Sequence, residues 1–470
     1  MLPIACALLT AIGFYFSIGL GEQWWLAWLA PVPVLWLAFG PTKRWPTFFA
    51  ALIGCALGAT SILRAYAGLL PTPVLILAIG APAFCFAVSV MGAQRVQRTH
   101  GPLFAMVAFA ALWTAFDFLA SFSKEGGSVG TPAAAEVGAP MLIQSASLVG
   151  YIGITFLLGF VAAGIALTLA TRKPAPAAIA VALFAVNAGY GYWRMSMPPK
   201  GSIEVALVES DDTVGAIRSM DKARTFNAIN AYADEVAKLD NAIADGHVNL
   251  VVLPENIARL DPAWRAEAEA KLAAAANAAH ATVVAGFNTY ADRAQRNVSL
   301  AFTPGALAPM TYMKRRLVPG LETSAYTPGP GPLAMRNGVG LEICKDMDFQ
   351  AMIRADEVAT HPQLLAVPAW DFDKDDWSHA RVAILRSVEN GVPMVRAARD
   401  GLLTINDRYG RLQERKRTVG GFTMVIGALP LDGRGGYTLY DRIGDLFGWL
   451  CVGLGIGILG LSYMRRRVTA

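Results

Sequence analysis

Residues 198–208 (Pro-Pro-Lys-Gly-Ser-Ile-Glu-Val-Ala-Leu-Val) mark an abrupt change in the composition of the chain. Long apolar segments precede this stretch, and a region with many more charged residues follows it. The run from Ile203 to Val208 is rich in the aliphatic and β-branched residues that favour a strand. The stretch therefore predicts the start of an α/β domain that follows a membrane-embedded one.

The overall composition indicates a membrane protein. The chain has 470 residues, of which 54% are hydrophobic and only 16% are charged, which is too apolar for a soluble enzyme. Its net charge of +5 comes largely from short basic clusters beside apolar segments, as is usual in membrane proteins. We therefore expect a chain embedded in a membrane, and no nucleic-acid partner.

Eight apolar segments are candidate membrane spans, because about 20 apolar residues cross a bilayer as a helix. They cover residues 2–20, 24–39, 48–66, 70–92, 103–122, 141–170, 175–193 and 446–464. The second is short, and the sixth is long enough for part of it to pack as a separate half-helix. We expect a membrane domain with about seven transmembrane helices in residues 1–195, an extracytoplasmic domain in 196–440, and a last transmembrane helix with a basic cytoplasmic tail in 441–470.

Basic residues predict the orientation of these segments. They follow every second segment and comprise Lys43, Arg44, Arg95, Arg98, Arg172, Lys173, Arg465, Arg466 and Arg467. Loops that carry Lys and Arg stay in the cytoplasm, so these ends share the cytoplasmic side. The domain in residues 196–440 is then expected on the opposite side of the membrane.

Strand and helix patterns alternate through residues 196–440. Strands are expected at 203–208, 250–253, 281–287, 297–303, 310–314, 339–344, 364–367, 394–397 and 402–405, and helices at 222–244, 262–280 and 377–390. This alternation is typical of a layered α/β fold. One expected strand begins with Asn297-Val298-Ser299, which matches the N-glycosylation pattern but means little without knowledge of the host.

The polar region contains a single cysteine, Cys344, whereas the other four cysteines fall in apolar segments. A lone thiol cannot form an internal disulfide, so it is either an inert core residue or a nucleophile. Two further residues whose side chains could take part in catalysis, Glu255 and Lys314, also end or follow expected strands. Strand ends in α/β folds commonly aim side chains into one crevice.

These three residue types suit thiol chemistry. A carboxylate can take the thiol proton, and an ammonium or a backbone N–H can stabilise an oxyanion. Lys314 and Lys345 would also favour the thiolate. Each residue alone has a structural explanation, since Cys344 could be a small core residue, Glu255 could open a loop, and Lys314 could lie on a solvated basic face.

The motifs around these residues resemble a known superfamily. Leu-Pro-Glu255, Tyr-Met-Lys314-Arg-Arg-Leu-Val-Pro-Gly-Leu-Glu322 and Glu-Ile-Cys344-Lys-Asp resemble the Glu, Lys and Cys motifs of the nitrilase (carbon-nitrogen hydrolase) superfamily. Eight spans that flank such a domain resemble its membrane-anchored branch, the apolipoprotein N-acyltransferase family. The resemblance implies a polytopic α-helical membrane domain and an α/β nitrilase-like four-layer α-β-β-α sandwich, and it identifies Glu322 as the second essential glutamate.

The chain departs from the family pattern directly after the nucleophile. The family usually has Tyr-Glu there, whereas this chain has Lys345-Asp346. Asp346 is expected to keep the carboxylate role, and Lys345 to keep the backbone N–H while presenting a different side chain to lipid or acceptor. The departure bears on the acceptor more than on the thiol chemistry.

The resemblance implies an acyltransferase of the bacterial inner membrane with its catalytic domain on the periplasmic side. Cys344, Glu255 and Lys314 would carry an acyl chain from a membrane phospholipid, as a thioester, to the N-terminal amine of a diacylglyceryl-modified lipoprotein. Glu322, Lys345 and Asp346 would support them. No cofactor and no metal ion are implied.

Two other functions fit parts of the sequence. A membrane-anchored amidase or nitrilase would use the same Glu-Lys-Cys triad, with water in place of the amine acceptor. A transporter or scaffold with an inactive enzyme-like domain would need charges within the spans, of which Asp117 is the clearest, with Glu136 in a nearby connector.

Overall fold

The computed structural model describes residues 1–470 except 211–212, 214–215, 217–220, 242–247, 292–293, 336–337, 419, 434 and 469–470. The chain divides into two compact units. The helical unit comprises Met1–Met197 with Arg442–Ala470, and the α/β unit comprises Pro198–Asp441.

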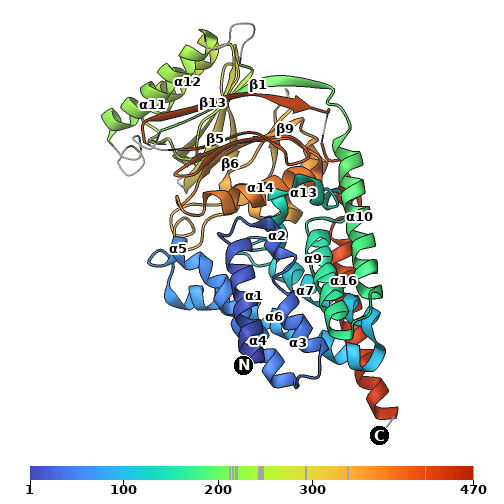
Figure 1. Ribbon diagram of the computed structural model, residues 1–470. Helices are drawn as coiled ribbons and strands as arrows, with labels where there is room; N and C mark the ends of the chain where they lie inside the picture. The colour runs from blue at the N-terminus through green and yellow to red at the C-terminus, as the bar shows by residue number, and fades with distance from the viewer. Residues whose placement is uncertain are drawn as a thin grey trace. The chain divides into compact units, whose positions relative to one another are not determined.

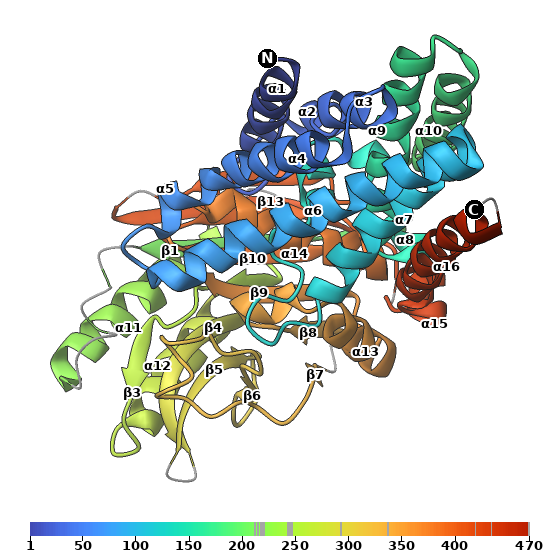
Figure 2. The same cartoon turned by 90° about the horizontal axis from the view of Figure 1, so that it is seen from below.

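The helical unit is a bundle of apolar helices. Its principal helices are α1 (Leu2–Ser17), α4 (Arg44–Ala59), α6 (Thr72–His100), α7 (Pro102–Ala120), α9 (Ile152–Thr171), α10 (Ala175–Met195) and α16 (Leu446–Val468). Helix α1 packs on α4, α4 on α6, α6 on α7, and α7 on α9 and α16 (Figure 2). Small residues allow close contact: a Cβ atom on Gly58 of α4 would lie 2.4 Å from Cβ of Phe14 on α1.

Short helices connect this bundle, and they modify the expected spans. They are α2 (Trp24–Ala27), α3 (Val32–Phe39), α5 (Leu63–Tyr66) and α8 (Ala146–Val149), with 3-10 turns at Thr60–Ile62, Pro132–Gly138 and Pro140–Leu142. Six helices of the described chain are long and apolar enough to cross a membrane. The expected span 2–20 is a helix of only 16 residues, and 24–39 is two short helices. The long segment 141–170 contains a full helix, α9, only from Ile152 onward.

The α/β unit contains two β-sheets. The first has the strand order β13-β1-β2-β4-β5-β6, with β3 also paired to β4, and the second has the order β12-β11-β10-β9-β8-β7. The strands of the first sheet are β1 (Gly201–Ser210), β2 (Leu250–Val252), β3 (Ala258–Leu260), β4 (Thr282–Ala291), β5 (Ala294–Phe302), β6 (Met310–Met313) and β13 (Phe422–Leu431). Those of the second are β7 (Leu333–Ala334), β8 (Val339–Leu341), β9 (Leu364–Trp370), β10 (Met394–Arg399), β11 (Leu402–Asn406) and β12 (Leu412–Arg417).

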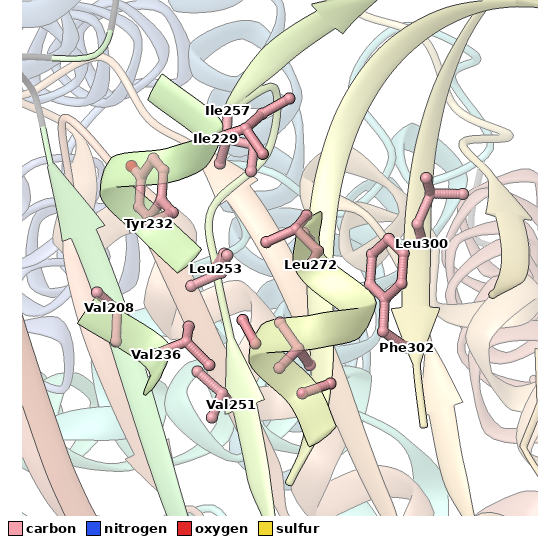
Figure 3. Packing of buried hydrophobic residues seen from close by; sticks show 14 of the residues in the cluster. Val208, Ile229, Tyr232, Val236, Val251, Leu253, Ile257, Leu272, Leu300 and Phe302 are labelled. Atoms are coloured by element: carbon pink, nitrogen blue, oxygen red, sulfur yellow. The ribbon is translucent and has the colours of Figure 1, made fainter. Parts of the chain in front are cut away.

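Helices cover the outer faces of both sheets (Figure 1). Helices α11 (Lys222–Ala237) and α12 (Arg265–Ala278) pack on the first sheet, and α13 (Gln350–Thr360) and α14 (Asp376–Asn390) pack on the second. Figure 3 shows the core under α11 and α12, where Tyr232, Leu272 and Phe302 are buried. A second apolar core lies between the sheets and includes Leu207 and Val395. The expected four-layer α-β-β-α sandwich is therefore confirmed.

Most expected strands and helices are present, but several others were not expected. Residues 242–244 of the expected helix 222–244 lie outside the described residues, and its described part ends as α11 and a 3-10 turn at Lys238–Asn241. Strands β3, β7, β12 and β13 and helix α13 were not expected, although the sequence of β13 is largely apolar. Strand β12 is mostly exposed, and so it lacks the apolar alternation by which a strand is recognised.

Strand direction brings the ends of β2 and β6 to one edge of the first sheet. Strand β2 is parallel to β4, and β6 is also parallel to β4 because both are antiparallel to β5. Residues that follow β2 and β6 can therefore approach each other even though two strands separate them. The candidate active site lies at this edge.

Candidate active site

Glu255 follows β2 by way of Leu253 and Pro254, and its side chain is buried. The residue is 2% exposed, and its N–H donates to the carbonyl oxygen of Ala369, 3.2 Å away. Strand β4 approaches this segment closely at Gly286, where a Cβ atom would lie 2.5 Å from Cα of Glu255. Only glycine leaves room for the glutamate there.

Lys314 follows β6 and joins two carboxylates. Its Nζ lies 2.7 Å from Oε1 of Glu255 and 2.9 Å from Oε2 of Glu322. Lys314 is 1% exposed, so these contacts form away from water, where ion pairs need close partners. The structure thus brings together Glu255, Lys314 and Glu322, three of the residues expected from the sequence.

Asn297 completes this group, and its role was missed from the sequence. Its Nδ2 donates to Oε1 of Glu255, at 2.5 Å, and to Oε1 of Glu322, at 2.7 Å. Its backbone oxygen accepts from the N–H of Lys314, at 2.9 Å. Asn297 is 1% exposed, so the folded domain does not present it for glycosylation. Residues Glu255, Asn297, Lys314 and Glu322 are called the lysine-centred cluster below.

Cys344 follows β8 and begins a 3-10 turn, Cys344–Asp348. Its φ of 44° lies in the left-handed region, which non-glycine residues adopt rarely and mostly at functional sites. The thiol is partly exposed and donates to the carbonyl oxygen of Trp370, 3.5 Å away. Within the described residues, the N–H of Lys345 has no acceptor, so it is available to bind an oxyanion.

Burial and charge separate the two glutamates of the lysine-centred cluster. Burial raises the pKa of Glu255, although Lys314 opposes this shift. Burial acts on Glu322 in the same sense, but Lys314 and the N–H of Val318 outweigh it and lower its pKa. Two carboxyl groups with pKa values pushed apart suit different tasks. The raised pKa makes the carboxyl group of Glu255 the better proton acceptor of the two, and the lowered pKa favours the ionised form of Glu322 beside Lys314.

Lys314 favours the thiolate of Cys344, as expected, but burial outweighs this effect, so the neutral thiol is favoured overall. Burial, followed by the charge of Glu255, raises the pKa of Cys344 well above its usual value. Lys314 lowers it, but by less. A neutral thiol needs a base to take its proton during attack, and Glu255 lies within electrostatic range of it.

Asp346 and Lys345 occupy different positions relative to the lysine-centred cluster. Asp346 is fully buried, and its Oδ1 accepts from the N–H of Arg316 at 2.8 Å, while its Oδ2 accepts from the N–H of Ile343 at 3.2 Å. Asp346 therefore ties the turn after Cys344 to the segment after β6. The Nζ of Lys345 lies 3.2 Å from Oδ2 of Asp348.

A buried ion pair supports the segment that contains Trp370, whose carbonyl oxygen accepts a hydrogen bond from the thiol of Cys344. Asp371 follows Trp370 directly, and Arg396 on β10 donates to both of its carboxylate oxygens, at 2.9 and 2.5 Å. Gly401 lies against the same carboxylate: a Cβ atom there would be 2.4 Å from Oδ2 of Asp371. Within the described part of the chain, no three or more His, Cys, Asp and Glu side chains are grouped to hold a metal ion.

Both units of the chain match known families. Residues 7–164 match the apolipoprotein N-acyltransferase N-terminal domain, and residues 205–429 match the carbon-nitrogen hydrolase domain. The two matches together place the chain beside the apolipoprotein N-acyltransferases, to which it is similar in both units. Five residues described above, Glu255, Asn297, Lys314, Glu322 and Cys344, all fall within the matched carbon-nitrogen hydrolase domain.

Relatives cover nearly all of the chain. The apolipoprotein N-acyltransferase of Geobacter metallireducens is 25% identical over 94% of this chain and 92% of its own length. That of Vibrio vulnificus is 22% identical over 99% of this chain and 97% of its own length. Among solved structures, the carbon-nitrogen hydrolase of Helicobacter pylori G27 is 15% identical, with a TM-score of 0.41, over 49% of this chain and 89% of that one.

Proposed function

We propose that this protein transfers an acyl chain from a membrane phospholipid, through a thioester on Cys344, to the N-terminal amine of a lipoprotein. The observation that carries the proposal is the buried contact between Glu255 and Lys314, 2.7 Å, with both charges acting on the thiol of Cys344. Relatives that cover nearly the whole chain are named apolipoprotein N-acyltransferase, which supports a lipoprotein as the acceptor.

In the first half-reaction, the carboxylate of Glu255 takes the thiol proton as sulfur attacks the ester carbon of the phospholipid. Lys314 and the N–H of Lys345 stabilise the resulting oxyanion, and losing one such donor typically costs about 3 kcal/mol. The carbon–oxygen bond then breaks, and Glu255 returns the proton to the departing alkoxide. The products are a lysophospholipid and an acyl thioester on Cys344.

In the second half-reaction, the neutral α-amino group of the lipoprotein attacks the thioester carbon. Glu255 takes a proton from the nitrogen, the carbon–sulfur bond breaks, and the sulfur regains a proton from Glu255. The acyl chain is then bound as an amide, and the thiol is free. Glu322 remains ionised throughout, so Lys314 keeps its charge in both oxyanion-forming steps.

We also propose that the α/β unit faces the periplasm from the inner membrane. The basic residues after the expected spans support this orientation. The two shortened helical segments at the N-terminus do not change it, because a pair of spans can be added or removed without changing the side on which residue 198 emerges. A reporter fused after Ser196 that is active only outside the cytoplasm should be active, and a reporter fused after Lys173 should be inactive.

The test of acyl transfer is the mass of the protein after incubation with phospholipid in detergent micelles. The wild type should gain the mass of one acyl chain, which neutral hydroxylamine removes and which disappears when a diacylglyceryl-modified peptide is added. Cys344→Ala should gain no mass and form no acylated peptide. Product formation by Cys344→Ala would overturn the proposal, and loss of the adduct to free fatty acid with no acylated peptide would indicate a hydrolase instead.

A further inference from the structure

A second buried polar cluster lies beside the turn that carries Cys344, and the proposed reaction does not use it. The phenol oxygen of Tyr312 lies 2.7 Å from Oε2 of Glu342 and 2.8 Å from Oδ2 of Asp346. The Nε–H of Arg315 donates to the same phenol oxygen at 3.1 Å. Residues Tyr312, Arg315, Glu342 and Asp346 are called the tyrosine-centred cluster below.

The number of hydrogens in this cluster requires a proton on one of the two carboxyl groups. A phenol has one hydrogen to donate, yet the oxygen of Tyr312 is within hydrogen-bond distance of two carboxyl oxygens. If both carboxyl groups were ionised, one of these short contacts would place an anionic oxygen against a lone pair in a buried site. A proton on Glu342 or Asp346 converts that contact into a hydrogen bond.

The backbone indicates which carboxyl group is ionised. Asp346 accepts hydrogen bonds from the N–H groups of Ile343, Arg315 and Arg316, at 3.2, 3.2 and 2.8 Å. Several N–H donors on one carboxylate stabilise its charged form. Among the described residues, the carboxyl group of Glu342 accepts from no backbone N–H, and its hydrogen-bond partners are the side chains of Tyr312 and Arg315. The proton is therefore more stable on Glu342.

The nearby cation does not fully compensate the negative charge that an ionised Glu342 would carry. Arg315, its cationic contact, also contacts both carboxylate oxygens of Asp356. Burial, followed by the charge of Asp346, raises the pKa of Glu342 well above its usual value, against the effect of Arg315. The titratable and charged groups that face Glu342 come from β6 and the segment after it, the 3-10 turn and α13, and they are Tyr312, Arg315, Asp346, Asp356 and Glu357.

We propose that Glu342 is a positioning residue held in its neutral, protonated form. Its O–H donates to Tyr312, and the O–H of Tyr312 donates to the ionised Asp346. Asp346 in turn accepts from the N–H of Ile343, which precedes Cys344, and from the N–H groups of Arg315 and Arg316 after β6. The turn Cys344–Asp348 is called the nucleophile turn below. Every hydrogen of this chain of contacts has an acceptor, and the phenol oxygen accepts from Glu342 and Arg315 with its two lone pairs. The proposal rests on the proposed function only where acyl transfer is the readout.

A neutral Glu342 makes the nucleophile turn sensitive to high pH. The folded-state pKa lies above the unfolded value, so the stabilisation is complete at low pH and is lost as the pH rises through the folded-state pKa. Above that pH, Glu342 becomes an anion beside Asp346, and the contact through Tyr312 becomes repulsive. The turn that carries Cys344 then loses its support.

The test compares Glu342→Gln with Asp346→Asn in the full-length protein. Glutamine keeps a neutral donor facing Tyr312 at every pH, so Glu342→Gln should stay within about threefold of wild-type acyl transfer at neutral pH. At alkaline pH, the acyl-transfer rate of Glu342→Gln should decrease less than that of the wild type. Asp346→Asn replaces an acceptor of three N–H groups with an amide and should lose at least about a hundredfold. Glu342→Ala should also lose activity, which glutamine restores.

A second measurement separates this proposal from the proposed function. The rate at which iodoacetamide alkylates Cys344, measured by mass spectrometry of the peptide that contains it, reports on the nucleophile turn whether or not acyl transfer occurs. Relative to wild type, Glu342→Gln should leave this rate unchanged at neutral pH, and Asp346→Asn should change it. The infrared C=O band of a protonated carboxyl group should be present in wild type at neutral pH and absent in Glu342→Gln.

The proposal is wrong if Glu342→Gln shows the same changes as Asp346→Asn in alkylation rate while it remains folded by its thermal midpoint. It is also wrong if the infrared band persists in Glu342→Gln but vanishes in Asp346→Asn, because the proton would then be on Asp346. A normal alkylation pattern in a protein without acyl transfer would overturn the proposed function alone.

Discussion

The two buried clusters beside Cys344 solve the same electrostatic problem with different groups. Each holds two carboxyl groups next to one another. In the lysine-centred cluster, the ammonium of Lys314 lies between Glu255 and Glu322, at 2.7 and 2.9 Å. In the tyrosine-centred cluster, a phenol lies between Glu342 and Asp346, at 2.7 and 2.8 Å, and the cation, Arg315, reaches Glu342 but is shared with Asp356. The proposed proton on Glu342 takes the place between the carboxyl groups that Lys314 holds in the other cluster.

This difference matches the two tasks proposed for the clusters. A cation between carboxylates can stabilise a developing oxyanion, and one of its partners can exchange a proton with substrate. A phenol between carboxyl groups offers no charge to a substrate, but it fixes the geometry of the turn through directional hydrogen bonds. Chemistry is therefore expected to depend on the first cluster, and positioning of the nucleophile on the second.

The largest loss of activity is expected from Glu255→Gln, a change in the lysine-centred cluster. Glutamine cannot take the thiol proton, so thioester formation should fall by about 10³-fold, within the range for loss of a general base. Glu322→Gln removes an anion but leaves the base and should cost about tenfold. Single-turnover formation of the acyl adduct measures both, and equal losses in the two variants would show that the glutamates do not have distinct roles.

The acid limb of the pH profile tests the role of Glu255 as base. The carboxyl group must be ionised to accept a proton, and burial raises its pKa. The rate should therefore fall about tenfold per pH unit below a pKa that lies above the ordinary value of about 4.3. The charge of Glu322 contributes to this rise, so Glu322→Gln should move the limb to lower pH. If the acid limb has the same pKa in Glu322→Gln as in the wild type, a group other than Glu255 is responsible for it.

A smaller effect is expected from Asn297→Ala, which leaves the charges in place and removes two hydrogen bonds to carboxylates. Hydrogen bonds to charged groups contribute about 1.5–3 kcal/mol, so kcat/KM should fall by about 10- to 100-fold. Asn297→Asp is the matched control, because it keeps the size of the side chain but adds a third carboxylate to Lys314. It should be worse than alanine, and wild-type activity in both variants would remove Asn297 from the cluster.

The smallest effect is expected from Lys345→Ala. The side chain of Lys345 contacts Asp348 rather than either cluster, and alanine keeps the backbone N–H that is proposed to bind the oxyanion. Acyl transfer should stay within about threefold of wild type, because the ion pair that is lost lies outside both clusters. A loss larger than tenfold with an unchanged thermal midpoint would mean that the ammonium itself contacts a substrate.

The chemical residues were easier to predict than their partners. Glu255, Lys314 and Cys344 each end or follow a short apolar strand, and this shared position at expected strand ends allows the sequence alone to group them. Asn297 lies within a strand and has no such signal. Its pairing with Glu255 depends on the register of β4 with β5, in which Asn288 is opposite Asn297, and on the position of β6, neither of which a local pattern contains.

Asp346 shows a second limit of sequence-based prediction. It was expected to keep a carboxylate role, and that role remains a proposal. The structure places its oxygens on the backbone of Ile343, Arg315 and Arg316. The sequence places Glu342 only in the expected strand before the nucleophile. It does not predict the protonation state of this residue, because the protonation state of a buried acid depends on the neighbours that the fold supplies.

The sequence by itself determined the division into an apolar helical region and an α/β domain, the alternation of strands and helices, and the presence of a thiol, a carboxylate and an ammonium near strand ends. These features follow from local composition and periodicity, which need no long-range contact. The tertiary structure decided which carboxyl groups share a cation and which share a phenol. Proton affinity in a buried site depends on charges and donors within a few ångströms, and strand register brings those groups together from distant parts of the chain.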